Sequence, residues 1–460
     1  MTSHVLTRWE PENESFWKEQ GARIANRNLW ISIPALMLSF SVWMLWSVVV
    51  VNLDKAGFQL SKNQMFWLAS LPALSGATLR IFYSFLIPIF GGRRWTAIST
   101  ASLLIPALGM GFALRDPSTG FPTLLVLALL CGLGGGNFSS SMSNISFFFP
   151  KARKGYATGM NAGIGNLGVS LTQFVVPMVI TGALLGGVTG DAHTYVKDGV
   201  EKSIWLQNAG FVWVPFILLT AIAAWFGMND IADAKASFAD QAVIFKRKHN
   251  WLMCWLYIGT FGSFIGFSAG LAMLTKSQFP DINPTTYAFL GPLVGALTRP
   301  IGGWISDKFG GARVTFYVFI AMVLAVIGVL QFLPHNNAGG NFFGFLIMFI
   351  VLFALTGVGN GSTFRMIPVI FLTERQRAAG RSEAAQKQAL LDANKEAAAV
   401  LGFSGAIGAY GGFFIPKSFG TSLEMTGSVD AALYCFIAFY LSCIVITWLW
   451  YSRKNAPMPC

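Results

Sequence analysis

Apolar residues gather in twelve long runs, which shorter polar stretches separate. Each run is long enough to cross a hydrocarbon layer of about 30 Å as a helix. The pattern therefore predicts an all-α polytopic membrane protein. The expected spans are 30–52, 64–90, 95–114, 122–149, 156–185, 204–227, 251–274, 285–306, 311–333, 342–371, 396–420 and 430–452.

The composition agrees with this pattern. Of the 460 residues, 54% are hydrophobic and 11% are charged, whereas soluble domains are about 25% charged. The first 28 residues are polar, and the apolar run that follows is too long for the core of a signal peptide. We therefore expect no cleavable signal peptide.

The net charge of +12 first suggests nucleic-acid binding, but the distribution of the basic residues argues otherwise. With the N-terminus inside, 22 of the 32 Lys and Arg fall in cytoplasmic segments, seven on the opposite side and three within spans. This bias is the positive-inside rule. It predicts that both termini are cytoplasmic, and it gives no indication of a nucleic-acid partner.

The chain reads as two similar halves. "RIFYSFLIPIFGGRR" (80–94) corresponds to "RPIGGWISDKFGGAR" (299–313), and "GGGNFSSS" (134–141) to "GVGNGSTF" (357–364). Two parallel halves of six spans are typical of a transporter that rocks one half against the other around a central site. The expected domains are a tail (1–28), a six-helix bundle (29–227), a linker (228–250), a second bundle (251–452) and a tail (453–460).

Two arginines stand inside these apolar runs. Arg80 and Arg299 each precede a Gly-Gly turn by eleven residues, which places them about 16 Å above it, near mid-bilayer. Each costs about 2.5–3.5 kcal/mol there. All 20 acids lie in tails, loops or span ends. A small anionic substrate is therefore the simplest counter-charge, with water and carbonyl dipoles as the alternative. Arg365 lies near a span end, where interfacial anchoring explains it.

The places of the carboxylates and histidines bear on whether transport is coupled to protons. A proton-coupled carrier needs a carboxylate or histidine in the membrane, and the four histidines also lie in loops or at span ends. An empty site with two positive charges should pass through the occluded state less readily than a loaded one. We therefore hypothesise an exchanger.

Two spans are rich in glycine, with three- and four-residue spacings that place the glycines on one helix face. That face permits either close helix packing or exposure of backbone to a small ligand. Asn161 and Asn166 lie on the first of these helices, where they either donate to an oxyanion or bond to a neighbouring helix. Tyr257 and Phe261 share a face of another span, as core packing or as site residues. The glycines are 159, 163, 165 and 168, then 402, 405, 408, 411 and 412.

The stretch "GWISDKFGGAR" (303–313) is similar to the loop motif G-x-x-x-D-[RK]-x-G-x-[RK] of the major facilitator superfamily. Asp307 in this motif can act as a charge latch that pairs in one conformation and releases in another, or it can be part of a static turn. Arg313 is expected to act with it. In the first half Pro88 occupies the position of that Asp, so a one-sided latch is expected.

The chain as a whole resembles the nitrate/nitrite porter family of that superfamily. The resemblance rests on "SGATLRIFYSFLIPIFGGRRWTA" (75–97), "NISFFFPK" (144–151), "GMNAGIGNLGVS" (159–170), "TFGSFIGFSAG" (260–270) and "GAIGAYGGFFIPKSFG" (405–420). It departs from relatives at Asn161-Ala162-Gly163, at Phe403-Ser404-Gly405 and at Arg365. It implies the following roles: Arg80 and Arg299 bind the anion, Asn166 and Tyr257 hydrogen-bond it, Phe138 and Phe261 sandwich or gate it, Asn161, Gly163, Gly165 and Gly408 line the site, and Gly168 and Gly411 let the helices flex.

The resulting hypothesis is nitrate/nitrite exchange in the bacterial cytoplasmic (inner) membrane by a monomer without cofactor or metal. Its partners would be nitrate, nitrite and the lipid bilayer. A nitrate/proton symporter and an exchanger of formate or oxalate are the alternatives. The five cysteines show no spacing of a metal site or disulfide framework. The longest polar stretches are too short for a signalling domain, and no buried catalytic group indicates an enzyme.

Overall fold

A computed structural model describes residues 4–83, 86–182, 185–197, 199–232, 243–334, 339–380 and 382–460. The chain divides into two compact units. The first comprises Met1–Lys235 together with Ser268–Leu290, and the second comprises Ala236–Phe267 and Gly291–Cys460. Residues 233–242 of the expected linker lie outside the described residues. The predicted domain boundaries remain a prediction.

The first unit is built from long helices, because a bilayer offers no partners for unpaired backbone groups. Short breaks at 44–45 and 102–103 divide two of the expected spans. The expected span 64–90 is described as α4 and α5, and residues 84 and 85 lie outside the described part. Its helices are α1 (Glu14–Phe16), α2 (Ala22–Trp43), α3 (Trp46–Val49), α4 (Lys62–Tyr83), α5 (Leu86–Phe90), α6 (Gly92–Ala101), α7 (Leu104–Ala113), α8 (Phe121–Phe148), α9 (Lys151–Thr181), α10 (Asn208–Phe211) and α11 (Val214–Gly227).

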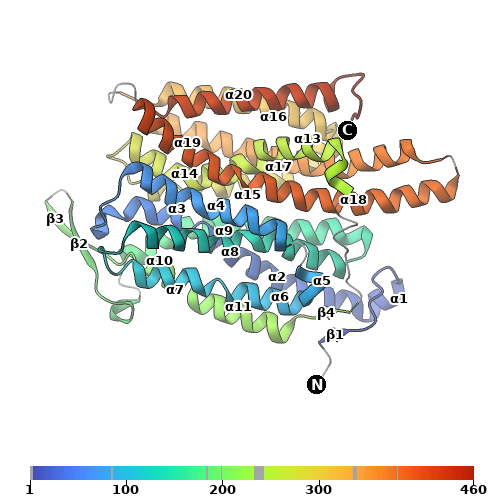
Figure 1. Cartoon of the computed structure of the whole chain (residues 1–460), viewed down its shortest axis with the longest axis horizontal. Coiled ribbons are helices and arrows are strands. Elements are labelled where there is room, and N and C mark those ends of the chain that lie inside the picture. The colour runs from blue at the N-terminus through green and yellow to red at the C-terminus, as the bar shows by residue number, and fades with distance from the viewer. Residues whose placement is uncertain are drawn as a thin grey trace. The chain divides into compact units, whose positions relative to one another are not determined.

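Within this unit α4 packs along α8, and α2 packs against both α8 and α9 (Figure 1). Two short strand pairs supplement the helices. Strand β1 (Val5–Leu6) runs parallel to β4 (Asp230–Ile231), and β2 (His193–Lys197) forms an antiparallel hairpin with β3 (Val200–Ile204). The first pair joins the N-terminal segment to the residues that follow α11.

The second unit is also helical. A π-helical turn at Ile258–Gly262 continues α13 into α14. The division of the chain between Phe267 and Ser268 falls within α14. The helices are α13 (Lys248–Tyr257), α14 (Ser263–Gln278), α15 (Leu290–Phe309), α16 (Gly311–Phe332), α17 (Phe342–Ala378), α18 (Glu383–Ala409), α19 (Gly411–Thr426) and α20 (Asp430–Thr447).

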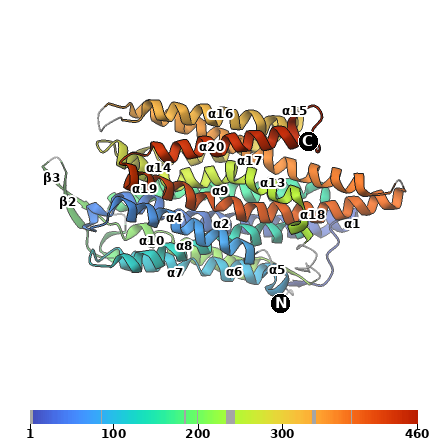
Figure 2. The same cartoon turned by 45° about the horizontal axis from the view of Figure 1, so that its top comes forward.

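Helices α17 and α18 are longer than the spans predicted at 342–371 and 396–420. The polar stretch between those spans is mostly helical, and in both views the orange ends of α17 and α18 run past the ends of α16 and α20 (Figures 1 and 2). Within this pair of helices the buried Glu396 of α18 accepts hydrogen bonds from Arg375 of α17 and from Arg247. Part of the charge in this stretch is therefore paired.

Eleven helical stretches in the described residues are long and apolar enough to cross a membrane. They correspond to eleven of the twelve predicted spans. The remaining span is the helix α15, whose Arg299, prolines and glycines lower its apolar character. The all-α fold is thereby confirmed, whereas the cytoplasmic placement of the termini stays a prediction.

Candidate functional site

Arg80 lies on α4 in the first unit and is fully buried, with 0% of its surface exposed. Its Nε donates a hydrogen bond of 2.8 Å to the carbonyl oxygen of Gly135 on α8. Aromatic rings surround the guanidinium: Cζ lies 4.7 Å from the ring centre of Phe138, 5.0 Å from Trp43 and 5.9 Å from Phe40. Cation–π attraction and a carbonyl dipole thus stabilise the buried charge.

Small residues bring α4 and α8 close enough for this contact. A Cβ atom added to Gly135 would lie 2.6 Å from the Trp43 ring and 2.8 Å from Cα of Gly76. A Cβ atom on Gly132 would collide with Ser75, which itself donates to the Leu129 carbonyl oxygen. These glycines are therefore packing residues, as is usual between membrane helices.

Arg299 lies on α15 in the second unit and is 9% exposed. Its Cζ lies 5.3 Å from the ring centre of Phe364 on α17. The Nη1 atom is buried, and no hydrogen-bond partner for it is found in the described part of the chain. A buried N–H of a charged group without an acceptor costs free energy.

Each of the two arginines follows a glycine that lies at a close helix crossing. A glycine precedes each by four residues, Gly76 before Arg80 and Gly295 before Arg299. In the second unit a Cβ atom on Gly357 of α17 would collide with the carbonyl oxygen of Gly295. The repeat seen in the sequence thus corresponds to the same close helix crossing in each unit.

The two asparagines predicted on α9 are both buried. Asn161 Nδ2 donates to Ser141 Oγ at 2.8 Å, so this amide bonds to the neighbouring helix α8. The Oδ1 atoms of Asn161 and Asn166 are buried, and neither has a hydrogen-bond partner among the described residues. The Oδ1 atom of Asn166 is an acceptor that can take a hydrogen bond from water, whereas only the amide nitrogen of Asn166 could donate to an anion.

The glycines predicted for the site divide into two groups. A Cβ atom on Gly163 would meet nothing within 4 Å, whereas one on Gly165 would lie 2.8 Å from Leu36 and one on Gly168 would collide with the Met37 carbonyl oxygen. Gly165 and Gly168 thus serve the packing of α9 on α2, and Gly163 faces open space.

In the second unit Tyr257 and Phe261 stack with ring centres 5.4 Å apart. Tyr257 ends α13 and Phe261 lies in the π-helical turn, a local form that is frequent at functional sites. A Cβ atom on Gly408 would lie 2.8 Å from the Tyr257 ring, and Gly411 packs on Gly262. The structure thus brings Tyr257, Phe261 and Gly408 together.

Asp307, at the end of α15, forms an ion pair with Arg365 of α17. Both side chains are substantially exposed, and Arg313 is exposed as well. Arg365, assigned to interfacial anchoring from the sequence, therefore has a carboxylate partner. The two residues lie 58 positions apart, so the loop motif does not reveal the pair.

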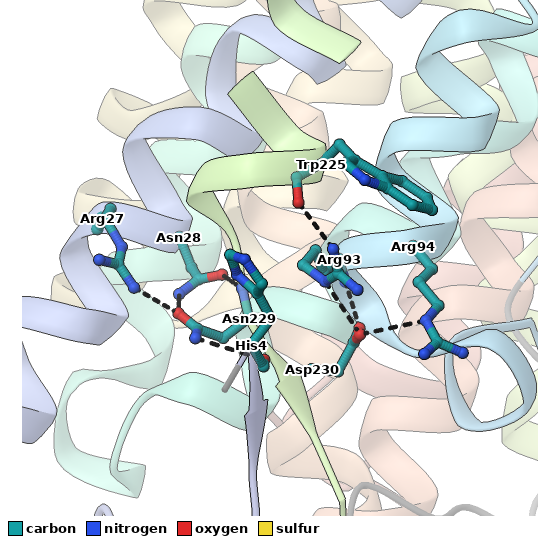
Figure 3. A network of polar contacts seen from close by, with 8 residues as sticks. All are labelled: His4, Arg27, Asn28, Arg93, Arg94, Trp225, Asn229 and Asp230. Atoms are coloured by element: carbon teal, nitrogen blue, oxygen red, sulfur yellow. Dashed lines mark hydrogen bonds and ion pairs between the residues drawn. The ribbon is translucent and has the colours of Figure 1, made fainter. Parts of the chain in front are cut away.

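The corresponding turn in the first unit is held by an acid from outside the motif. Asp230 accepts a hydrogen bond of 2.8 Å from the backbone N–H of Arg93 and one of 3.3 Å from its Nε, with Arg94 Nε at 3.8 Å (Figure 3). Arg93 Nη1 donates to the Trp225 carbonyl oxygen and its guanidinium lies over the Trp225 ring. Asp230 thus supplies the charge that Pro88 cannot.

The N-terminal segment joins this network. Asp230 N–H donates to the His4 carbonyl oxygen at 2.9 Å. The next residue back, Asn229, accepts from Arg27 at 2.7 Å, and its N–H donates to Asn28 Oδ1 at 2.8 Å (Figure 3). Sequence reasoning missed this network, as it missed Trp43 and Phe364, because their partners lie on other segments.

The residues predicted for the site carry guanidinium, amide, hydroxyl and aromatic groups. Among the described residues no group of three or more His, Cys, Asp or Glu is arranged to hold a metal ion. The positive charge and hydrogen-bond donors of each arginine suit an anion.

The class of the protein follows from its similarity to known proteins. Residues 31–382 match the family model described as Major Facilitator Superfamily. The chain is 52% identical over 458 residues to the "Nitrate/nitrite transporter NarU" of Salmonella typhimurium, which covers 98% of this chain and 97% of that relative. It is 52% identical over 459 residues to the protein of the same name from Escherichia coli, with the same coverage.

A third relative is the "Probable nitrate/nitrite antiporter NarK2" of Thermus thermophilus, 42% identical over 462 residues, or 99% of this chain and 98% of the relative. The chain belongs to the major facilitator superfamily and, within it, to the nitrate/nitrite porter family. It is a multi-pass membrane protein.

Proposed function

We propose that this chain transports nitrate and nitrite across the bacterial cytoplasmic (inner) membrane by exchanging one for the other. The observation that carries the proposal is the buried Nη1 of Arg299, which has no hydrogen-bond partner among the described residues. Relatives named as nitrate/nitrite transporters at 52% identity support the choice of anion.

The chemistry of arginine fits such an anion. An arginine at mid-bilayer costs about 2.5–3.5 kcal/mol, and an anion that accepts its hydrogen bonds offsets this cost. The guanidinium is planar, so it can give two parallel hydrogen bonds to the planar nitrate or nitrite. We propose that Arg80 and Arg299 both bind the anion.

The other predicted residues complete the proposed site. Asn166 and Tyr257 would hydrogen-bond the anion, and Phe138 and Phe261 would cover its faces. Asn161, Gly163, Gly165 and Gly408 would line the path, Gly165 in addition to its packing against Leu36. Gly168 and Gly411, which lie at close helix contacts, would let α9 and α18–α19 flex. Asp307 and Arg313 would act in the conformational change.

Alternating access explains why exchange is expected. In the proposed rocker-switch the two halves expose the site to one side and then to the other. Two positive charges without an anion should resist passing through the dry occluded state. The carrier with a bound anion would therefore change between the two access states much faster than the empty carrier.

Arginine-to-lysine variants test the proposal. Arg80→Lys and Arg299→Lys keep the charge but lose the planar fork, so the rate of nitrate uptake into nitrite-loaded proteoliposomes should fall about 10- to 100-fold in each. Arg94→Lys is the matched control, because Arg94 lies outside the proposed site and half-exposed beside Asp230; it should exchange normally. Normal exchange by either site variant would refute the proposal.

The same vesicles separate the anion classes. Formate or oxalate loaded in place of nitrite should drive little nitrate uptake. If they drive it as well as nitrite does, the protein is a general exchanger of small anions.

A further inference from the structure

We infer that Trp43 of α2 is a positioning residue that sets the orientation of Arg80. The inference rests on the proposed function, since it concerns how one arginine of the proposed anion site is held. Trp43 lies 37 positions before Arg80 in the sequence, and no motif identifies it.

The indole ring of Trp43 is fixed from several sides. It is 1% exposed, and its Nε1 donates a hydrogen bond of 2.7 Å to the carbonyl oxygen of Pro72. Phe40 packs against it with ring centres 5.5 Å apart. A Cβ atom on Gly76 would lie 2.6 Å from Nε1. The absence of side chains at Gly76 and Gly135 thus creates the space that the ring fills.

Arg80 is oriented by this ring together with the backbone of α8. Its Cζ lies 5.0 Å from the Trp43 ring centre, within the range of a cation–π contact. The Nε hydrogen bond to Gly135 fixes one edge of the guanidinium. The Trp43 contact and the Gly135 hydrogen bond, with the Phe138 ring at 4.7 Å, together restrict the orientations open to the guanidinium. The binding of a planar anion then requires less ordering of a flexible side chain.

The two units differ in this respect. Arg299 has the Phe364 ring at 5.3 Å. Phenylalanine has no N–H that could fix it to a backbone carbonyl, and its ring attracts cations less than that of tryptophan. Trp43 therefore orients Arg80 more firmly than Phe364 orients Arg299.

The test compares Trp43→Leu, Trp43→Phe and Trp46→Leu in nitrite-loaded proteoliposomes. Initial rates of nitrate uptake give the KM and the maximal rate. Trp43→Leu should raise the KM about 30-fold, the loss expected for a desolvated cation–π contact, and change the maximal rate less. Trp43→Phe keeps an aromatic face and should restore most of the affinity. Trp46→Leu removes an equally buried indole nearby and should leave the KM unchanged.

Nitrate-dependent thermal stabilisation of the purified protein is a second readout. The shift in melting temperature at a fixed nitrate concentration should shrink in Trp43→Leu and persist in Trp46→Leu. A merely structural role would lower the melting temperature of both variants without changing their response to nitrate.

If Trp43→Leu fails to fold, a variant at Gly76 tests the role of the Trp43 ring in another way. Gly76→Ala presses on the indole and should also raise the KM, and this effect should be smaller in the Trp43→Phe background, where the ring is smaller. A wild-type KM in Trp43→Leu or in Gly76→Ala would overturn the inference, as would an equal rise in Trp46→Leu. Normal exchange in Arg80→Lys would instead refute the proposed function itself.

Discussion

At the scale of single residues, the buried arginines show how a charge is kept in an apolar environment. Arg80 has a carbonyl oxygen and three aromatic rings around it. Arg299 has one ring and a buried N–H without an acceptor among the described residues. The sequence indicated both arginines from their apolar surroundings, but their neighbours come from other helices.

Glycines of the same helix are predicted to differ in their tolerance of a side chain. Gly168→Ala should lower the melting temperature, because its Cβ collides with the Met37 carbonyl oxygen. Gly163→Ala has open space and should keep or raise it, since alanine favours a helix by about 0.5–1 kcal/mol. Thermal unfolding in detergent measures both. A loss of exchange in a stable Gly163→Ala protein would indicate that this glycine serves the anion path; equal melting temperatures would contradict the packing difference.

At the scale of elements, ends of helices in each unit are joined by charge pairs. Asp307 joins α15 to α17 through Arg365. Asp230 joins the residues after α11 to the start of α6 through Arg93. The two acids occupy different places in the chain, and the internal repeat predicts neither pair: it indicated Asp307 but not its partner Arg365.

Loss of the Asp230 charge should weaken the start of α6 and the β1–β4 contact. Both Asp230 and Arg93 are buried, and removing one partner of a buried pair costs about 3–5 kcal/mol. We expect Asp230→Asn to lower the free energy of unfolding by about 3 kcal/mol, because the amide keeps some hydrogen bonds. Thermal unfolding and backbone hydrogen exchange at Arg93 and Asp230 measure it.

The exposed pair of Arg8 and Glu10 is the control. Glu10→Gln should leave the stability unchanged, because solvent screens such pairs. A stable Asp230→Asn protein with protected amides at these positions would contradict the role given to the network.

At the scale of the whole molecule, the two buried arginines are expected to make the change between the two access states fastest when an anion is bound. The acids of the ion pairs found in the described residues lie in loops, terminal segments or parts of helices near their ends, except Glu396, which lies in the middle of α18. By the spans predicted from the sequence, each of these acids lies at a span end or outside the spans, whereas a proton carrier is expected within the membrane.

Exchange should therefore proceed without proton movement. Nitrate uptake into nitrite-loaded vesicles should be unchanged by an imposed pH gradient, and empty vesicles should take up nitrate slowly even when the inside is alkaline. A pH-sensitive dye in the vesicle lumen makes the measurement. Acidification of the lumen in proportion to nitrate uptake would establish symport and contradict exchange.

The sequence by itself determined the membrane class, the approximate bounds of the spans, the repeat and the two arginines. These features depend on local composition and spacing, which a linear pattern carries directly. It also determined that glycines would line helix faces, but it left packing and ligand exposure open at each position.

Only the tertiary structure decided which residues face one another. Trp43 against Arg80, Arg365 with Asp307, and Asp230 with Arg93 are contacts between residues 37 to 137 positions apart. It also showed that Gly168 is a packing glycine while Gly163 faces open space. The physical reason is that cation–π contacts, ion pairs and close helix crossings form between segments that chain folding alone brings together, so no local pattern records them.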